Sequence, residues 1–133
     1  MRFKIFRCAA TFGLLAAAAG ACANNDADIK TCIKYPTYVQ AAIDACTRLI
    51  DEPPLFDSTR DGWFMARGRH KVKAGDLKGA LSDFDEAIRL SAKNPTLYRL
   101  RAETYQQLGD IRAAKRDFAR SRRFDAEKAA GGP

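Results

Sequence analysis

The 133-residue sequence has one histidine, His70, and one tryptophan, Trp63. Catalysis by acid–base or nucleophilic groups needs several ionisable side chains that converge on one point, and a structural zinc takes four ligands. The sequence also has no activated-serine motif and no phosphate-binding loop. We therefore expect no enzyme activity, no catalytic residue, no cofactor and no metal site. We expect His70 on a helix surface, and Trp63 in packing or linker contacts rather than in a ligand platform.

Long hydrophobic runs are also scarce, and the main one, residues 8–19, is shorter than the roughly 20 residues that a helix needs to cross a bilayer. Three basic residues precede this run, and the small-residue stretch GACAN follows it. This order is typical of a secretory signal peptide, which we assign to residues 1–23. The sequence therefore predicts an exported protein of the bacterial periplasm or cell envelope.

Two processing routes remain open at the end of this segment. Ala21 and Ala23 suit a general signal peptidase, whereas AAGAC resembles a bacterial lipobox in which Cys22 is lipidated. The lipobox is imperfect because Ala19 stands where Leu is usual. We favour the soluble form, with lipidation of Cys22 as the alternative. Membrane contact is expected only through that lipid anchor.

Processing also decides the cysteine count. Cys8 leaves with residues 1–23 and Cys22 is removed or lipidated, so Cys32 and Cys46 remain in either case. Two thiols in an oxidising compartment suggest one disulfide, and two buried free thiols are the alternative. Their spacing does not fit a redox CxxC motif. The same cleavage removes three basic residues and lowers the formal net charge of +7 by three, to +4.

One stretch of the sequence occurs twice. GDLKGALSDFDEAI, residues 75–88, returns 34 residues later as GDIRAAKRDFARSR, residues 109–122. The apolar residues of the first copy recur at helical spacing, which predicts a helix with one buried face. Asp76 is placed to cap this helix, and Gly75 is placed to end the preceding helix, residues 62–74.

Each copy is therefore a helical hairpin, in residues 61–94 and 95–128. Asn94 as a cap and Pro95 in the first turn begin the second hairpin. A single hairpin cannot bury its apolar face, so repeated hairpins must stack against each other. The predicted fold class is all-α, with antiparallel helix hairpins stacked as a short α-solenoid.

This joint pattern resembles the tetratricopeptide repeat. The resemblance rests on the 34-residue period, on an Ala and a Phe four residues apart, and on an aromatic residue four positions before a small one. These residues are Ala80, Phe84, Ala114, Phe118, Phe64, Gly68, Tyr98 and Ala102. The chain departs from the repeat at Lys71, Ala92 and Ala126, and it has Arg67 and Arg101 where Leu is common. These departures concern fine packing, not the hairpin architecture.

A partial unit precedes the two hairpins. Residues 36–52 carry an apolar stripe like that of a second helix whose first helix is missing. In its place lie residues 24–35, which are polar and too short for a helix of matching length. A disulfide would hold this N-terminal segment over the open end of the stack. We assign residues 53–60 to a linker and residues 129–133 to a flexible tail.

The resemblance implies a concave groove, lined by the first helices, that binds a protein or an extended peptide. The groove face contains three cations, one acid and two apolar residues among eight positions. They are Met65, Arg69, Val72, Lys73, Thr96, Arg99, Glu103 and Gln106. This composition favours an acidic partner that also carries an apolar side chain. The alternative function is a structural subunit or cap of a cell-envelope assembly.

The second hairpin is basic, because residues 95–128 hold nine Lys or Arg and five acids. Nucleic acid would suit such a surface, but an exported protein seldom meets it. We expect no nucleic-acid partner and interpret the charge as a solvated outer face, with anionic lipid or an acidic partner as the alternative. The sequence names neither the partner nor the oligomeric state.

Overall fold

The computed structural model describes residues 25–34, 38–52 and 59–131. The assigned signal peptide, Cys22 and most of the assigned linker lie outside these residues. The described residues form six helices and no strand, so the predicted all-α fold is confirmed. The helices are α1 (Asn25–Ile33), α2 (Val39–Asp51), α3 (Arg60–Lys73), α4 (Leu77–Leu90), α5 (Pro95–Gln107) and α6 (Ile111–Ala129).

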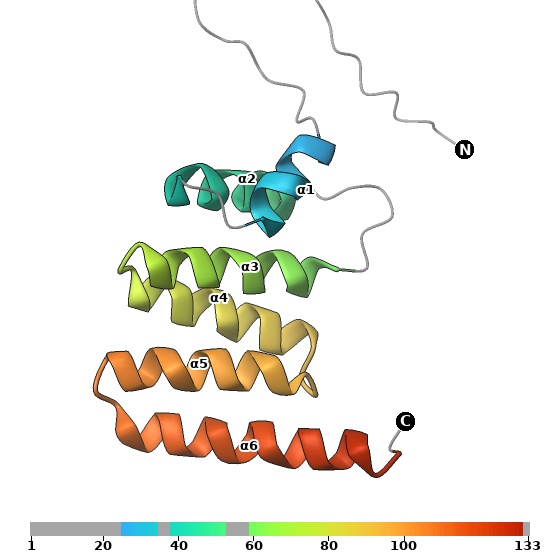
Figure 1. The fold of residues 1–133 in the computed structure, drawn as a ribbon, viewed down its shortest axis with the longest axis vertical. Coiled ribbons are helices and arrows are strands. Elements are labelled where there is room, and N and C mark those ends of the chain that lie inside the picture. Colours follow the sequence, from blue (N-terminus) through green and yellow to red (C-terminus); the bar gives the residue numbers. More distant parts are fainter. Residues whose placement is uncertain (1–24, 35–37, 53–58, 132–133) are drawn as a thin grey trace, which may run out of the picture.

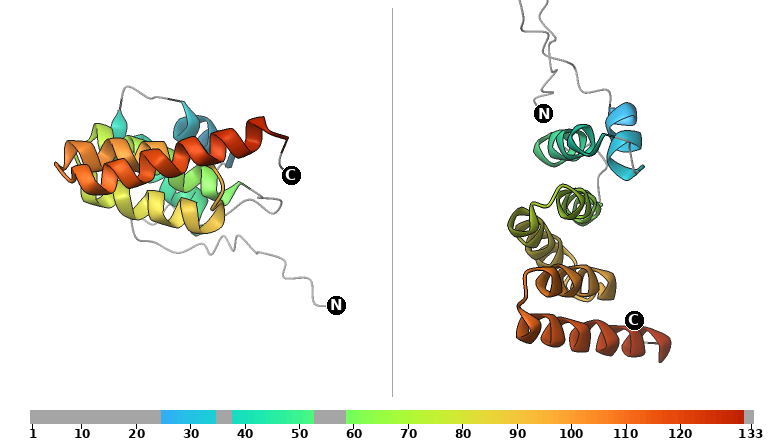
Figure 2. Two further views of the ribbon diagram at one scale, coloured as in Figure 1. Left: turned by 90° about the horizontal axis from the view of Figure 1, so that it is seen from below. Right: turned by 60° about the vertical axis from the view of Figure 1, so that its left-hand side comes forward.

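The helices stack in chain order, with α1 and α2 at one end of an elongated column and α6 at the other (Figures 1 and 2). Consecutive helices pack as antiparallel hairpins, α3 on α4 and α5 on α6, and α4 packs on α5 to join the two hairpins. This is the arrangement that lets each hairpin bury the apolar face it cannot cover alone.

Capping side chains begin these helices, and glycines with a left-handed backbone end them. Asp76 accepts a hydrogen bond from the backbone N–H of Gly79 at 2.9 Å, and Asp110 does the same for Ala113 at 2.9 Å. Each cap follows a glycine in the left-handed region, with φ of 82° at Gly75 and 81° at Gly109. Side chains with a Cβ are strained there, so glycine is the residue that can turn the chain between the two helices of each hairpin.

The contact between α3 and α4 depends on a glycine whose missing side chain leaves room for a neighbouring ring. A Cβ built on Gly68 would lie 2.7 Å from the ring of Phe84, which is fully buried. The small residue and the aromatic residue of the repeat are therefore matched in shape, because the ring occupies the space that a side chain on α3 would need.

The N-terminal end is held by a disulfide between Cys32 of α1 and Cys46 of α2, as the cysteine count predicts. An ion pair adds a second link, because both carboxylate oxygens of Asp28 accept hydrogen bonds from Arg48, at 3.0 and 2.6 Å. The sequence predicts that residues 24–35 are too short for a helix of matching length, and the short helix α1 forms there. It is nine residues long against thirteen in α2, so it fills only part of a first-helix position.

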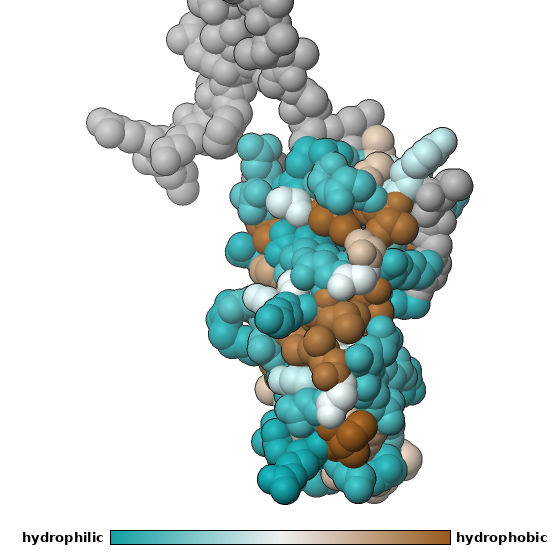
Figure 3. Space-filling model, turned by 90° about the vertical axis from the view of Figure 1, so that its left-hand side faces the viewer, coloured by the Kyte–Doolittle hydropathy of each residue, from teal (hydrophilic) through white to brown (hydrophobic). Residues whose placement is uncertain are grey.

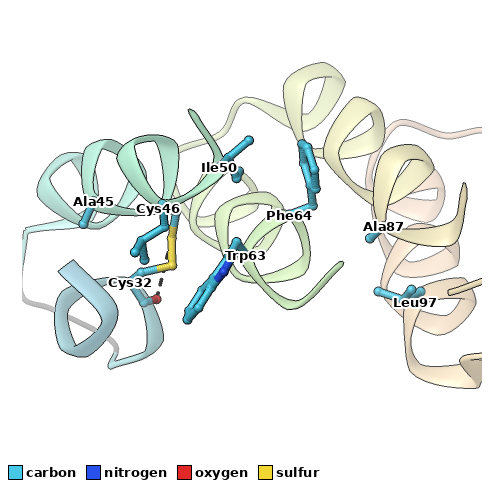
Figure 4. Close-up of a cluster of buried hydrophobic side chains, with 9 residues drawn as sticks. Cys32, Ala45, Cys46, Ile50, Trp63, Phe64, Ala87 and Leu97 are labelled. Carbon is cyan, nitrogen blue, oxygen red and sulfur yellow. Dashed lines mark hydrogen bonds between the residues drawn. A yellow bond between two sulfur atoms is a disulfide. The ribbon is translucent and has the colours of Figure 1, made fainter. Parts of the chain in front are cut away.

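Trp63 belongs to the core that this end encloses. Its side chain is buried and lies beside the Cys32–Cys46 disulfide in the close-up of the cluster (Figure 4). The predicted packing role of Trp63 is therefore confirmed. The cluster continues from α1 to α5 through Leu49 and Leu97, so one core links the N-terminal end with both hairpins.

The expectation that His70 lies on the surface is wrong. Only 3% of His70 is exposed, and its Nε2 atom lies 2.9 Å from the carbonyl oxygen of Cys32. Because a carbonyl oxygen only accepts, Nε2 is the donor and carries the proton. Position 70 is seven residues after Trp63 and shares its helix face, and α1 covers that face. The sequence signal for the burial of His70 was its spacing of seven residues from Trp63, which places both side chains on one face of the helix.

Candidate functional site

A hollow of about 220 Å³ opens between α3 and α5. Arg69, Val72 and Lys73 line it from α3, at the spacing of one helix face. Four residues of α5 line it from the second repeat, and two of them, Glu103 and Gln107, stand 34 residues after Arg69 and Lys73. The α5 residues are Leu100, Glu103, Thr104 and Gln107, and the ring of Phe84 from α4 closes the floor.

Four of the eight predicted groove residues meet in this hollow, namely Arg69, Val72, Lys73 and Glu103. The other four do not line it. Met65 packs against the buried core cluster instead. Thr96, Arg99 and Gln106 lie on a neighbouring face of α5, because the lining positions are set one residue further along that helix.

Sequence reasoning missed Phe84, Leu100, Thr104 and Gln107. The signal for three of them was present, since Leu100, Thr104 and Gln107 fall with Glu103 at i, i+3, i+4 and i+7 on one face of α5. Phe84 was identified as a core residue, and the hollow reaches one side of its ring.

The hollow combines charge at its rim with apolar surface inside. Arg69 and Lys73 bring two cations from α3, while Glu103 and Gln107 bring a carboxylate and an amide from α5. The apolar surface comes from Val72 and Leu100, and the buried ring of Phe84 lies beneath them. On the side of the α3–α4 and α5–α6 turns, apolar surface forms an interrupted band down the stack between hydrophilic side chains (Figure 3).

The helices that form this hollow are held in place by a repeated ion pair. Arg67 of α3 donates to both carboxylate oxygens of Asp83 on α4, and Arg101 of α5 does the same to Asp117 on α6. Lys71 also pairs with Asp83 at 2.9 Å. Three of the departures from the repeat pattern, Arg67, Lys71 and Arg101, therefore have buried carboxylate partners, so they stabilise the packing.

Each of these arginines also reaches back to the preceding hairpin. Arg67 donates to the hydroxyl of Thr47 on α2 at 3.1 Å, and Arg101 donates to Asp85 on α4 at 2.5 Å. Burial lowers the pKa of Arg101, but hydrogen bonds to Asp117 and Asp85 outweigh it and raise the pKa above its ordinary value. Arg101 therefore stays charged and holds α5 against both neighbours.

Within residues 25–34, 38–52 and 59–131, no helix combines the length and apolar character of a membrane span. The same part of the chain contains no group of three or more His, Cys, Asp or Glu side chains placed to hold a metal ion.

Comparisons with known proteins agree with this architecture. Residues 68–109 match the family model described as TPR repeat. Sperm-associated antigen 1 of Rattus norvegicus is 26% identical over 84 residues, which cover 63% of this chain and 9% of that protein. The solved structure of MamA MSR-1 C2 superposes with a TM-score of 0.68 at 20% identity, over 83% of this chain and 62% of that one.

Tetratricopeptide-repeat proteins are protein–protein interaction modules and are generally non-catalytic scaffolds. The chain spans less than two thirds of each of these two relatives, so the likeness concerns the repeats and the fold. The 34-residue period, the stacked hairpins and the family model that matches residues 68–109 together show that the chain has the tetratricopeptide-repeat fold.

Proposed function

We propose that this chain is a non-catalytic, exported interaction module that binds an extended peptide segment in the hollow between α3 and α5. The observation that carries the proposal is the meeting of corresponding positions from two repeats. Arg69 and Lys73 form one rim, and Glu103 and Gln107 form the other. Because both rims come from first helices, an extended chain can lie across them and contact each repeat in turn.

The chemistry of the rim favours a segment with a carboxylate side chain. Arg69 and Lys73 place two positive charges at this rim, which attract a carboxylate. Across the hollow, Glu103 can accept from a backbone N–H of the bound segment, and Gln107 can both donate and accept.

The size and the floor of the hollow favour side chains over a small molecule. Its volume of about 220 Å³ is below the roughly 300–1,000 Å³ typical of small-molecule sites. The apolar surfaces of Val72 and Leu100, above the buried ring of Phe84, can take an apolar side chain next to the carboxylate. We therefore propose a partner segment in which Asp or Glu neighbours a large apolar residue.

A peptide selection tests this function. Random displayed peptides selected on the processed protein should be enriched in Asp or Glu beside Leu, Ile or Phe. The double variant Arg69→Ala, Lys73→Ala should bind a selected peptide at least about tenfold more weakly, since charge-assisted hydrogen bonds are lost. The loss should shrink at high salt, which screens the charges in the parent protein.

Arg99→Ala is the matched control, because Arg99 is an exposed cation of α5 that lies outside the hollow. It should leave peptide affinity within about twofold, well below the tenfold that one strong hydrogen bond supplies. Equal weakening by the double variant and by Arg99→Ala would refute the assignment of the hollow. Thermal melts of all variants should show that folding is kept.

Export forms the second part of the proposal, and the disulfide supports it. Structural disulfides such as Cys32–Cys46 persist in oxidising compartments outside the cytosol. The mature protein should therefore lack residues 1–23. Intact-mass measurement on protein from its native cell tests this, and a mass that includes residues 1–21 would overturn export. An added mass from acyl chains would select lipidation of Cys22.

A further inference from the structure

The outer face of α6 carries a cluster of cations that the hollow does not use. At 100° per residue, six cationic positions fall within about 160° of the helix circumference. They are Arg112, Lys115, Arg116, Arg120, Arg122 and Arg123, all exposed. The buried residues of α6, such as Ala114 and Asp117, lie on the opposite side. We call these six residues the basic face.

The second helix of the first repeat, α4, shows that this position in the fold does not need such charge. At the same six positions, 34 residues earlier, α4 carries two cations, one acid, one serine and two apolar residues. They are Lys78, Leu81, Ser82, Glu86, Ile88 and Arg89. The two copies share the helix-contact residues Ala80, Asp83 and Phe84 as Ala114, Asp117 and Phe118, so the basic face is a separate property of the second copy.

The same comparison argues against another helix on this side. Ile88 packs against the core cluster that includes Leu97 of the next helix, α5. Its counterpart on α6 is Arg122, and the counterpart of Leu81 is Lys115. Covering these charges with a further repeat would require their desolvation. Within the described residues, α6 packs only against α5.

From this placement we propose that the basic face binds an anionic lipid bilayer surface. Figure 1 shows α6 at one end of the stack, so its outer side can lie against a flat surface without obstruction from the other helices. From Arg112 to Arg123 the helix is about 17 Å long at 1.5 Å per residue, so its cations can approach a plane along one side. Arg120 and Arg123 also lie over the rings of Tyr98 and Phe124, so Arg112, Lys115 and Arg116 carry most of the proposal. Each Lys or Arg near an anionic leaflet adds attraction.

The side chains between the cations favour lipid over protein or nucleic acid. Ala119 and Ala126 are the exposed apolar residues near the centre of the face, whereas protein interfaces rely on large aromatic or apolar anchors. Phe124, the aromatic residue near the end of α6, packs its ring against Tyr98 at 5.3 Å rather than projecting for base stacking. Of the two acids near this end of α6, Asp125 lies off the face. Glu127 lies within its arc, one turn after Arg123, and pairs with Arg123 at 3.5 Å.

Vesicle co-sedimentation tests the proposal. The probe is vesicles of equimolar phosphatidylglycerol and phosphatidylcholine, with pure phosphatidylcholine vesicles as the neutral comparison. The processed protein, without residues 1–23, should sediment with the anionic vesicles at low salt, stay in solution with the neutral ones, and be released at high salt. No sedimentation with the anionic vesicles at low salt would overturn the proposal.

A matched pair of triple variants separates the basic face from net charge. Arg112→Gln, Lys115→Gln and Arg116→Gln remove three cations that form no ion pair or ring contact within the described residues. This variant should bind anionic vesicles about 100-fold more weakly. The control, Lys78→Gln, Arg89→Gln and Lys93→Gln, removes the same charge from the first repeat and should bind within about threefold of the parent, because its cations lie off the face.

Two further outcomes decide against the proposal. Equal losses in the two triple variants would mean that only net charge matters. A nucleic-acid oligonucleotide that releases the protein from vesicles at phosphate concentrations far below that of the lipid would assign the face to nucleic acid. Peptide binding in the hollow should be the same in both variants, so this test is independent of the proposed function.

Discussion

Asp83 of α4 accepts two hydrogen bonds from the guanidinium group of Arg67 on α3, at N–O distances of 3.0 and 2.7 Å. The same geometry joins Arg101 to Asp117 in the next hairpin, at 2.7 and 2.9 Å. Both Asp side chains are almost fully buried. The repeat therefore carries a buried ion pair as well as an apolar core.

Asp83→Ala should destabilise the fold by about 3 kcal/mol, because it leaves the charges of Arg67 and Lys71 without their buried partner. Urea unfolding followed by circular dichroism measures the loss. The control is Glu86→Ala, which breaks an exposed pair with Arg89 on the same helix and should cost no more than about 0.5 kcal/mol. Similar small losses in both variants would show that the buried pair is not needed for stability.

Gly68→Ala should lower stability by about 1–3 kcal/mol, because its new Cβ would lie 2.7 Å from the ring of Phe84. Thermal unfolding gives the measurement. Gly62→Ala is the control on the same helix, since the nearest side-chain atom to a Cβ there is 4.0 Å away. That variant should be neutral or stabilising by up to about 1 kcal/mol. A Gly68→Ala protein as stable as the parent would show that the α3–α4 contact adjusts freely.

Cys32→Ser with Cys46→Ser should reduce the free energy of unfolding by about 3 kcal/mol, on the chain-entropy estimate for a loop of about 15 residues. The loss should be local at first, because α1 is short and the disulfide ties it to α2. Hydrogen exchange should therefore accelerate in Asn25–Ile33 while the amides of α5 and α6 stay protected. Uniform acceleration through all six helices would contradict the idea that α1 is a separately attached cover.

His70→Ala should cost about 1–3 kcal/mol, because it removes the donor to the Cys32 carbonyl oxygen and leaves that buried acceptor unsatisfied. His70→Gln offers a donor of similar reach and should recover part of the loss. Urea unfolding under oxidising conditions, with the disulfide intact, gives both values. An alanine variant with parental stability would mean that water or a shift of α1 satisfies the carbonyl group.

The sequence by itself determined the hairpins and their stacking. Asp76 and Asn94 are capping residues, Gly75 permits the left-handed turn, and the 34-residue return of Ala80 and Phe84 predicts the helix contact. These features are local or periodic, so they can be recognised without knowing which helices meet. The cysteine count likewise pointed to the Cys32–Cys46 disulfide.

The rotation of each helix was decided only by the tertiary structure. Successive residues on a helix differ by 100°, so a face assigned from periodicity can be wrong by one residue. That is why the hollow contains Leu100 and Gln107 where the sequence suggested Arg99 and Gln106.

The tertiary structure also decided which polar side chains are buried. His70 is enclosed because α1, thirty-eight residues away at Cys32, lies over its helix face. Arg67 stands where the repeat usually has Leu, and it is accommodated because Asp83 and Thr47 approach it from two other helices. A helical pattern indicates which side of one helix is apolar. The partner that satisfies a buried charge comes from a distant part of the chain, so it is known only once the helices are packed.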